Sequence, residues 1–133
     1  MKLFDRTLQV AERSLDVRLS KQNVLNGNLA NADTPGYIAR DVNFDQAMTI
    51  VTDPRTTMSS TQEGHFSLGD EIEFDEILAE DSPTSGSSLD GNTVDLDRTM
   101  AALSENATQY SVVTKALSKK LGILKYVASD GFG

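Results

Sequence analysis

Apolar residues recur at alternating steps of four and three near both ends of the chain. Near the N-terminus the repeat is apolar at seven of nine positions: Phe4, Leu8, Ala11, Leu15, Arg18, Gln22, Leu25, Leu29 and Ala32. Near the C-terminus it is apolar at nine of ten positions: Leu96, Met100, Leu103, Ala107, Tyr110, Thr114, Leu117, Leu121, Leu124 and Ala128. This spacing places the residues on one face of a helix that packs against other helices. The pattern predicts a mainly α protein with long helices within residues 1–33 and 93–133, packed as a coiled-coil-like pair or bundle.

Each predicted helix carries a second apolar line beside the first. The N-terminal line is Leu3, Val10, Val17 and Val24, and the C-terminal line is Val113, Ala116, Ile123 and Val127. Two adjacent lines form a face wider than one partner helix covers, so each helix is expected to contact more than one neighbour. Arg18 and Gln22 interrupt the N-terminal repeat, and the sequence leaves open whether they fix the register of packing or are partly solvated.

The first helix is expected to end near Asp33, because short polar side chains gather there. Asn28 and Asn31 can bond to nearby backbone and compete with the helical ladder. The residues Thr34-Pro35-Gly36-Tyr37 then fit a type II turn, in which Gly36 supplies a positive φ. An ordinary helix stop is the alternative interpretation of the same Pro-Gly pair.

The segment 34–92 differs from both ends in charge and pattern. Residues 35–92 hold two basic and twelve acidic residues, a net charge of −10, whereas each flanking end carries +1. This middle segment is therefore expected to face water, with an irregular, loop-rich structure.

Short elements are still predicted within the middle segment. Residues 37–44 suit an extended strand, and residues 44–51 suit a short helix with Phe44, Ala47, Met48 and Val51 on one side. The alternation of Phe66 and Leu68 with Ile72 and Phe74 around Gly69-Asp70 predicts a small β-hairpin.

Composition excludes several classes of function. The net charge of −8 argues against a nucleic-acid-binding surface, and the sequence has no Cys and a single His, His65. Motifs for nucleophilic, zinc or nucleotide chemistry are missing, so neither an enzyme nor a cofactor is expected. The acidic residues from Asp70 to Asp81 are interpreted as a solvated strand face rather than a calcium site, and residues 90–97 depart from the EF-hand pattern because Val94 occupies a ligand position.

Export is the remaining question that the sequence alone addresses. Residues 1–8 lack the apolar run of a secretory signal, and no segment approaches the roughly 20 apolar residues of a membrane span. A protein with this sequence that leaves the cytoplasm is expected to use a route other than the Sec pathway.

Three strings resemble the bacterial flagellar rod and hook axial protein family. Residues 28–44, NLANADTPGYIARDVNF, resemble the signature that follows the first helix of rod proteins, and residues 58–65, MSSTQEGH, resemble a shorter central match. Residues 88–98, SLDGNTVDLDR, resemble the segment that leads into the last helix of the proximal rod members. A second asparagine-rich signature, usual before the final helix in the other members, is missing here.

The resemblance implies a structural subunit of the proximal rod of the flagellar basal body. Such a subunit polymerises through its terminal helices, forms part of the drive shaft and of the export channel wall, and is needed for motility. The implied partners are copies of itself, other rod proteins, the basal-body adaptor protein beneath the rod and the export gate, with no nucleic acid and no small-molecule substrate. The implied location is the rod in the periplasmic space, reached by type III export without a cleaved signal peptide.

The residues expected to mediate assembly belong to the two helices and the turn. They are Phe4, Leu8, Leu15, Leu25, Asn28, Leu29, Asn31, Thr34, Pro35, Gly36, Tyr37, Leu103, Tyr110, Leu117, Leu121 and Leu124. A cytoplasmic coiled-coil adaptor or export chaperone of a type III secretion system is the alternative, since it would share the acidic charge and the helical ends.

Overall fold

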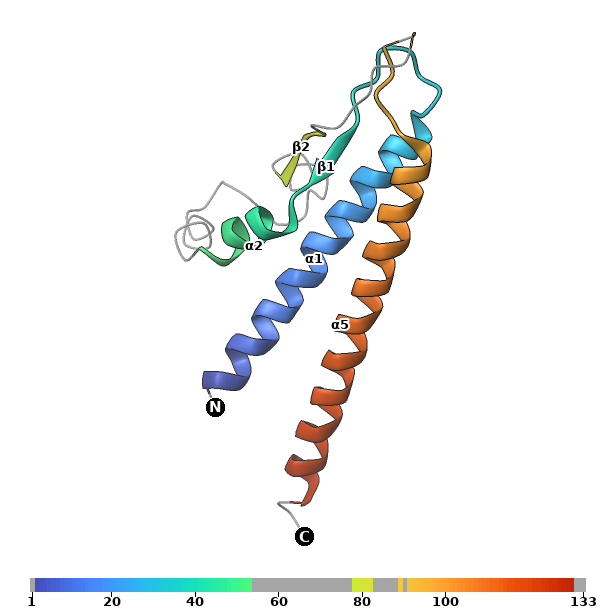
Figure 1. Ribbon diagram of the computed structural model, residues 1–133. Coiled ribbons are helices and arrows are strands. Elements are labelled where there is room, and N and C mark those ends of the chain that lie inside the picture. Colours follow the sequence, from blue (N-terminus) through green and yellow to red (C-terminus); the bar gives the residue numbers. More distant parts are fainter. Residues whose placement is uncertain (1, 54–77, 83–88, 90, 131–133) are drawn as a thin grey trace, which may run out of the picture.

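Two long antiparallel helices form the body of the molecule (Figure 1). The computed structural model describes residues 2–53, 78–82, 89 and 91–130. Helix α1 spans Lys2–Ala30 and helix α5 spans Leu96–Asp130. The N-terminal end of α1 and the C-terminal end of α5 lie toward the same end of the molecule. The link between α1 and β1 lies at the other end. The expected mainly α fold with long terminal helices is therefore confirmed.

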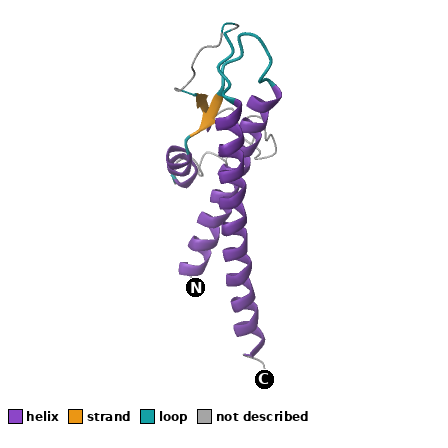
Figure 2. Ribbon diagram, turned by 45° about the vertical axis from the view of Figure 1, so that its right-hand side comes forward, coloured by secondary structure: helices purple, strands orange, loops and turns teal. Residues whose placement is uncertain are grey.

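A small α/β unit packs against the side of α1 that faces away from α5 (Figures 1 and 2). It contains strand β1 (Arg40–Val42), helix α2 (Phe44–Thr52) and strand β2 (Ala79–Asp81). The strands pair antiparallel with Arg40 opposite Asp81 and Val42 opposite Ala79. Strand β1 lies within the predicted extended segment, whereas the hairpin predicted around Gly69-Asp70 lies outside the described residues.

Helix α2 forms where the apolar pattern predicts it. The side chain of Asn43 caps its start, accepting hydrogen bonds from the backbone N–H groups of Asp45 at 3.1 Å and Gln46 at 3.2 Å. The predicted apolar side faces a core made of Val17, Val42, Ala47, Leu78 and Ala79, with Val24, Phe44, Met48 and Val51 packed against it.

Helix α5 begins after Asp95, which serves as its N-cap. The carboxylate of Asp95 accepts a hydrogen bond from the N–H of Arg98 at 3.0 Å, which is the contact of an N-cap residue. None of the helices in the described part is both long and apolar enough to cross a membrane.

Candidate assembly site

Helix α1 uses two of its sides within the chain. Leu25, on the predicted repeat, is 4% exposed and lies on the side that packs against α5, while Val17, on the second apolar line, is 0% exposed and packs in the core with α2 and β1. The two lines therefore contact different elements, which confirms that one partner helix does not cover this face. Leu8, Leu15 and Leu29 are half-buried; Phe4 lies in α1, but its side chain is outside the described part.

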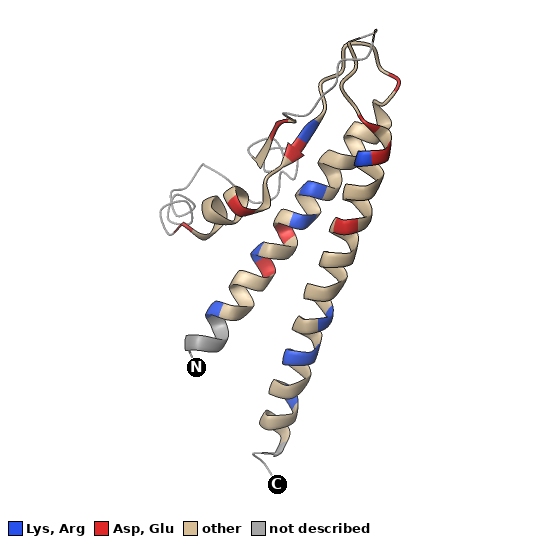
Figure 3. Cartoon of the chain, in the orientation of Figure 1, with Lys and Arg blue, Asp and Glu red and all other residues tan. Residues whose placement is uncertain are grey.

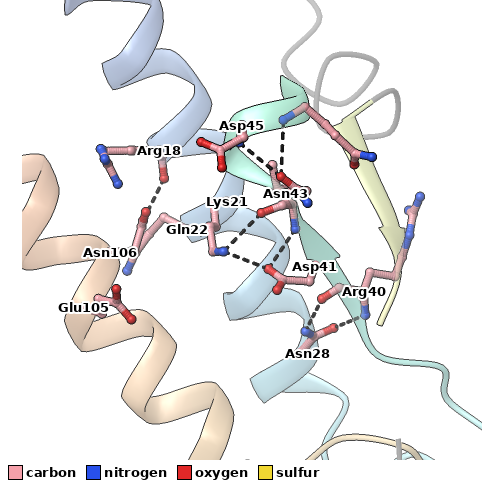
Figure 4. A network of polar contacts seen from close by, with 12 residues as sticks. Arg18, Lys21, Gln22, Asn28, Arg40, Asp41, Asn43, Asp45, Glu105 and Asn106 are labelled. Carbon is pink, nitrogen blue, oxygen red and sulfur yellow. Dashed lines mark hydrogen bonds and ion pairs between the residues drawn. The ribbon is translucent and has the colours of Figure 1, made fainter. Parts of the chain in front are cut away.

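Asn28 joins the last turns of α1 to strand β1 (Figure 4). Its amide Nδ2 donates to the carbonyl of Arg40 at 2.6 Å, and its Oδ1 accepts from the N–H of Arg40 at 2.9 Å. Tyr37 also donates its hydroxyl hydrogen to Oδ1 at 3.2 Å. The amide thus offers β1 the donor and acceptor that a neighbouring strand would offer, on the edge that β2 does not occupy.

Lys21 fixes β1 to α1 two turns before Asn28. Its Nζ donates to the carbonyl of Val42 at 3.1 Å and lies 3.2 Å from a carboxylate oxygen of Asp41 (Figure 4). With Asn28, this contact sets the direction in which the chain leaves the helix.

The expected turn is present at residues 34–37. The N–H of Tyr37 donates to the carbonyl of Thr34 at 3.3 Å, and Gly36 has φ = 71°. These are the hydrogen bond and the positive φ of a type II turn. Helix α1 itself stops at Ala30, three residues before the expected end, and Asn31 begins the turns that follow, its Nδ2 donating to the carbonyl of Gly27 at 2.8 Å.

Asn92, which is distant from α1 in the sequence, binds the backbone just after the C-terminal end of α1. Its Nδ2 lies 2.9 Å from the carbonyl oxygens of Asn31 and Ala32 and 2.7 Å from that of Thr34, so it binds the carbonyls of the turns that follow the helix. Asn92 is 4% exposed, and its Oδ1 accepts from the N–H of Val94 at 2.8 Å. Asn92 was not among the predicted assembly residues, although it lies in the string SLDGNTVDLDR that resembles the proximal rod members.

Thr93 and Gly91 complete the contact between the two strings. Thr93 Oγ1 accepts from the N–H of Ala39 at 2.7 Å, and its own N–H donates to the carbonyl of Tyr37 at 3.0 Å. A Cβ on Gly91, whose φ is 77°, would lie 3.6 Å from Gly36 Cα, so the two turns pack directly on each other. We refer to residues 28–40 and 91–95 together as the junction.

The middle of the α1–α5 interface is polar. Asn106 Nδ2 donates to the carbonyl of Arg18 at 2.8 Å and to Gln22 Oε1 at 2.9 Å, and the guanidinium of Arg18 donates to Gln109 Oε1. The Arg18 guanidinium also lies 4.2 Å from the ring centre of Phe44, a cation–π contact. Both interrupting residues of the N-terminal repeat therefore bond to α5, which favours the interpretation that they fix the register.

Arg18 keeps its charge in this partly buried position. Burial lowers the pKa of its guanidinium, and the nearby Glu105 carboxylate opposes that shift. A guanidinium with these contacts remains protonated at neutral pH.

The predicted repeat of α5 is only partly covered by the chain itself. Leu103, Leu117 and Leu124 are half-buried, but Tyr110 is 39% exposed and Leu121 is 47% exposed. The fully buried positions of the described part of α5 are instead Thr99 and Asn106. The helix pair is thus joined through small and polar residues, and much of the apolar repeat stays available for other molecules.

Apart from the α1 residues Phe4, Leu8, Leu15, Leu25 and Leu29, the predicted assembly residues separate into two places. Those of the turn and the end of α1 (Asn28, Asn31, Thr34, Pro35, Gly36 and Tyr37) lie together in the junction, where Asn28, Asn31, Thr34 and Tyr37 form hydrogen bonds within the chain. Those of α5 lie along a surface that extends away from the junction. Among the residues that the structure describes, no group of three or more His, Cys, Asp or Glu could hold a metal ion.

Comparison with known proteins gives a single family. A family model described as flagella basal body rod protein matches residues 8–37, a range that includes most of α1 and the turn after it. The flagellar basal body rod protein FlgB of Escherichia coli (strain K12) is 35% identical over 139 residues, covering 96% of each chain. FlgB of Aeromonas hydrophila is 32% identical over 129 residues, covering 96% of each chain, and FlgB of Bacillus subtilis (strain 168) is 32% identical over 131 residues, covering 98% of this chain and 99% of its own. The chain belongs to the FlgB family of flagellar basal body rod proteins.

Proposed function

We propose that the chain is a structural subunit of the proximal rod and polymerises through its terminal helices. In that role it assembles with other rod proteins, forms part of the drive shaft and of the export channel wall, and is needed for motility. The family relationship supports the role. The observation that carries the mechanism is the exposed apolar repeat of α5, because within the described part of the chain residues such as Leu121 stay 47% exposed.

The two places on the molecule serve this role differently. The junction fixes the angle between α1, β1 and the start of α5, so it determines how each subunit presents its helices. The two terminal segments, residues 1–33 and 93–133, form the rod-core domain, and residues 34–92 form the middle region. Leu103, Tyr110, Leu117, Leu121 and Leu124 are the α5 residues that contact neighbouring subunits.

Partners and location follow from the same assignment. Besides copies of itself and other rod proteins, the subunit contacts the basal-body adaptor protein beneath the rod and the export gate. It reaches the periplasmic part of the basal body through type III export without a cleaved signal peptide. A structural family is consistent with the absence of catalysis, and the three relatives are all rod proteins rather than cytoplasmic adaptors or chaperones.

Replacement of the gene in a motile bacterium tests this function. We expect a strain that lacks the protein to be non-motile, and we expect purified basal bodies from the complemented strain to contain it. Normal swimming without the protein, or a protein found only in the cytoplasm, would refute the assignment.

A further inference from the structure

The side of α5 that faces away from α1 carries a second repeat. Val112, Ala116, Lys119, Ile123 and Tyr126 follow one another at steps of four and three, with Lys115 beside them, and all six side chains are exposed. Val112 is 61% exposed, Ile123 56% and Tyr126 67%, which is unusual for residues of this size. Residues 106–129 contain four Lys and no Asp or Glu, as the lower half of α5 in Figure 3 shows. We refer to these six residues as the basic face.

Helix α1 has a third side that the chain leaves open. Glu12, Asp16, Leu19 and Asn23 also follow at steps of four and three, and all four side chains are exposed. Leu19 is 46% exposed, so this side too combines charge with apolar surface. Its two charged residues, Glu12 and Asp16, are acidic and the neighbouring Arg13 only partly offsets them, so the charge of this side is negative. We refer to these four residues as the acidic face.

The two faces lie on opposite outer sides of the molecule and overlap in level near Glu12 and Lys115. Arg18 of α1 bonds to Gln109 of α5, and Gln22 bonds to Asn106. Because the helices are antiparallel, the residue numbers of positions at the same level add up to about 127. Glu12 therefore lies roughly level with Lys115. Asp16 lies two residues from Arg18, about 200° around α1, and Lys115 lies nine residues from Asn106, about 180° around α5. Neither face can therefore reach the other within one chain.

We propose that the acidic face of one copy binds the basic face of a second copy, side by side and at the same level. The proposal rests on the proposed rod function and specifies which surfaces meet. The contact joins two different patches, so it leaves a free acidic face at one side and a free basic face at the other, and the association can continue around an axis. Opposite charges align the copies, and burial of Leu19 against Val112 adds an apolar part to the contact.

The environment of Asp16 supports this arrangement. Partial burial and repulsion from Glu12 raise the pKa of the Asp16 carboxyl, and Arg13 only partly offsets them. An ammonium group from a neighbouring Lys115 would relieve the repulsion between the two carboxylates.

Cysteine cross-linking tests the contact directly, because the chain has no Cys of its own. Glu12→Cys combined with Lys115→Cys should give a ladder of disulfide-linked multimers of this chain when purified basal bodies are oxidised. Glu12→Cys combined with Asp97→Cys is the matched control: both positions are exposed, but Asp97 lies about 18 residues, or roughly 27 Å, from the level of Lys115. The control pair should give no ladder.

Charge reversal provides a second measurement that does not depend on thiol geometry. Glu12→Lys with Asp16→Lys, and separately Lys115→Glu with Lys119→Glu, should each reduce swimming several-fold. The four changes together should restore most of it, because the charges are again complementary. All sites are exposed, so circular dichroism of each purified variant should match the parent.

The outcomes separate the contact from the function. A chain that is present in basal bodies but forms no ladder, with a fourfold variant no better than the double variants, would overturn the proposed contact and leave the rod function standing. A cross-link from Lys115→Cys to a different rod protein alone would overturn the choice of a second copy. Absence of the unmodified protein from basal bodies would remove both the contact and the function.

Discussion

The junction and the C-terminal half of α5 differ in where their side chains find partners. In the junction, buried amides such as Asn28 and Asn92 are 3% and 4% exposed, and their bonding groups meet partners inside the chain. In the C-terminal half of α5, large apolar side chains such as Leu121 and Ile123 are 47% and 56% exposed. The chain therefore sets its own geometry with hydrogen bonds and leaves apolar surface to be buried by other subunits.

This division suits a subunit that must fold its junction as a monomer and bury its remaining apolar surface on assembly. Burial of one Leu or Ile side chain stabilises a structure by about 1.5–3 kcal/mol, so the exposed residues of α5 represent a driving force that only association can use. The junction, by contrast, gains little from association, because its groups already have partners.

The largest expected effect comes from placing a charge on the exposed repeat. Leu121→Asp should leave expression, solubility and export nearly unchanged but block rod formation, because the carboxylate would be buried without a partner in the assembly. Truncation of a Leu that assembly buries costs roughly 2–5 kcal/mol, so Leu121→Ala should weaken assembly less severely than Asp does. Swimming assays and electron microscopy of basal bodies measure both.

Two exposed residues of the sheet provide the control for that variant. Glu80→Lys and Asp81→Lys change charge at exposed positions of β2 and should have little effect. Normal swimming and intact rods in Leu121→Asp cells would show that this surface does not take part in assembly.

A smaller effect is expected in the junction, and it should appear in the monomer. Asn28→Ala leaves the N–H and C=O of Arg40 without their side-chain partner, so it should lower the free energy of unfolding by about 1–3 kcal/mol. Urea denaturation of the purified protein measures the loss, with Asn26→Ala, an exposed neighbour in the same helix, as the control. Equal stability of the two variants would mean that the Asn28 contacts do not hold β1.

The turn should respond through backbone conformation alone. No atom lies within 4 Å of a Cβ built on Gly36, so Gly36→Val meets strain from its positive φ rather than a collision. This should cost about 1–2 kcal/mol, while Gly36→Asn should cost less, because Asn tolerates the left-handed region. Thermal unfolding and swimming assays of the Gly36→Val and Gly36→Asn variants check the turn. We expect Gly64→Val to be milder, because the sequence predicts a loop at Gly64, a position outside the described residues.

The smallest effect is expected at Gly122, on an exposed side of α5. A Cβ there meets nothing within 4 Å, and replacement of a helical Gly by Ala stabilises a helix by up to about 1 kcal/mol. In the isolated monomer we expect amides 112–128 to exchange hydrogen faster than those of residues 15–29, and Gly122→Ala to slow that exchange. Strong protection of residues 112–128 in a verified monomer would contradict the view that this half of α5 depends on assembly.

The local sequence pattern was enough to predict the described helices and strand β1, but not strand β2. The repeat that contains Leu25 predicted α1, and the repeat that contains Leu121 predicted α5. The spacing of Phe44, Ala47, Met48 and Val51 predicted α2 and its buried side. The turn at Gly36 also followed from local chemistry, since a Pro-Gly pair restricts φ wherever it occurs.

The partners within the chain could not be predicted in the same way. Asn92 contacts carbonyls about 60 residues away in sequence, and nothing in its neighbourhood indicates that distance. Likewise, the apolar repeat of α5 did not reveal that Thr99 and Asn106, one position away from Met100 and Ala107, would be the buried contacts with α1. Spacing identifies a face, but several faces of a helix can be apolar, and only the tertiary structure assigns each one to a neighbour.

The pairing of β1 with β2 determines where the chain can accept insertions. Ala39 accepts a hydrogen bond from Ser82 and Val42 lies opposite Ala79, so both ends of the intervening sequence are held at fixed points. Closing a longer loop between fixed points costs only about 0.6 kcal/mol for each doubling of its length. Since the sequence predicts a loop-rich middle segment, we expect insertions between Asp53 and Leu78 to be tolerated without altering the spacing of the two long helices, which makes this segment the natural place to add an epitope or a reporter to the assembled protein.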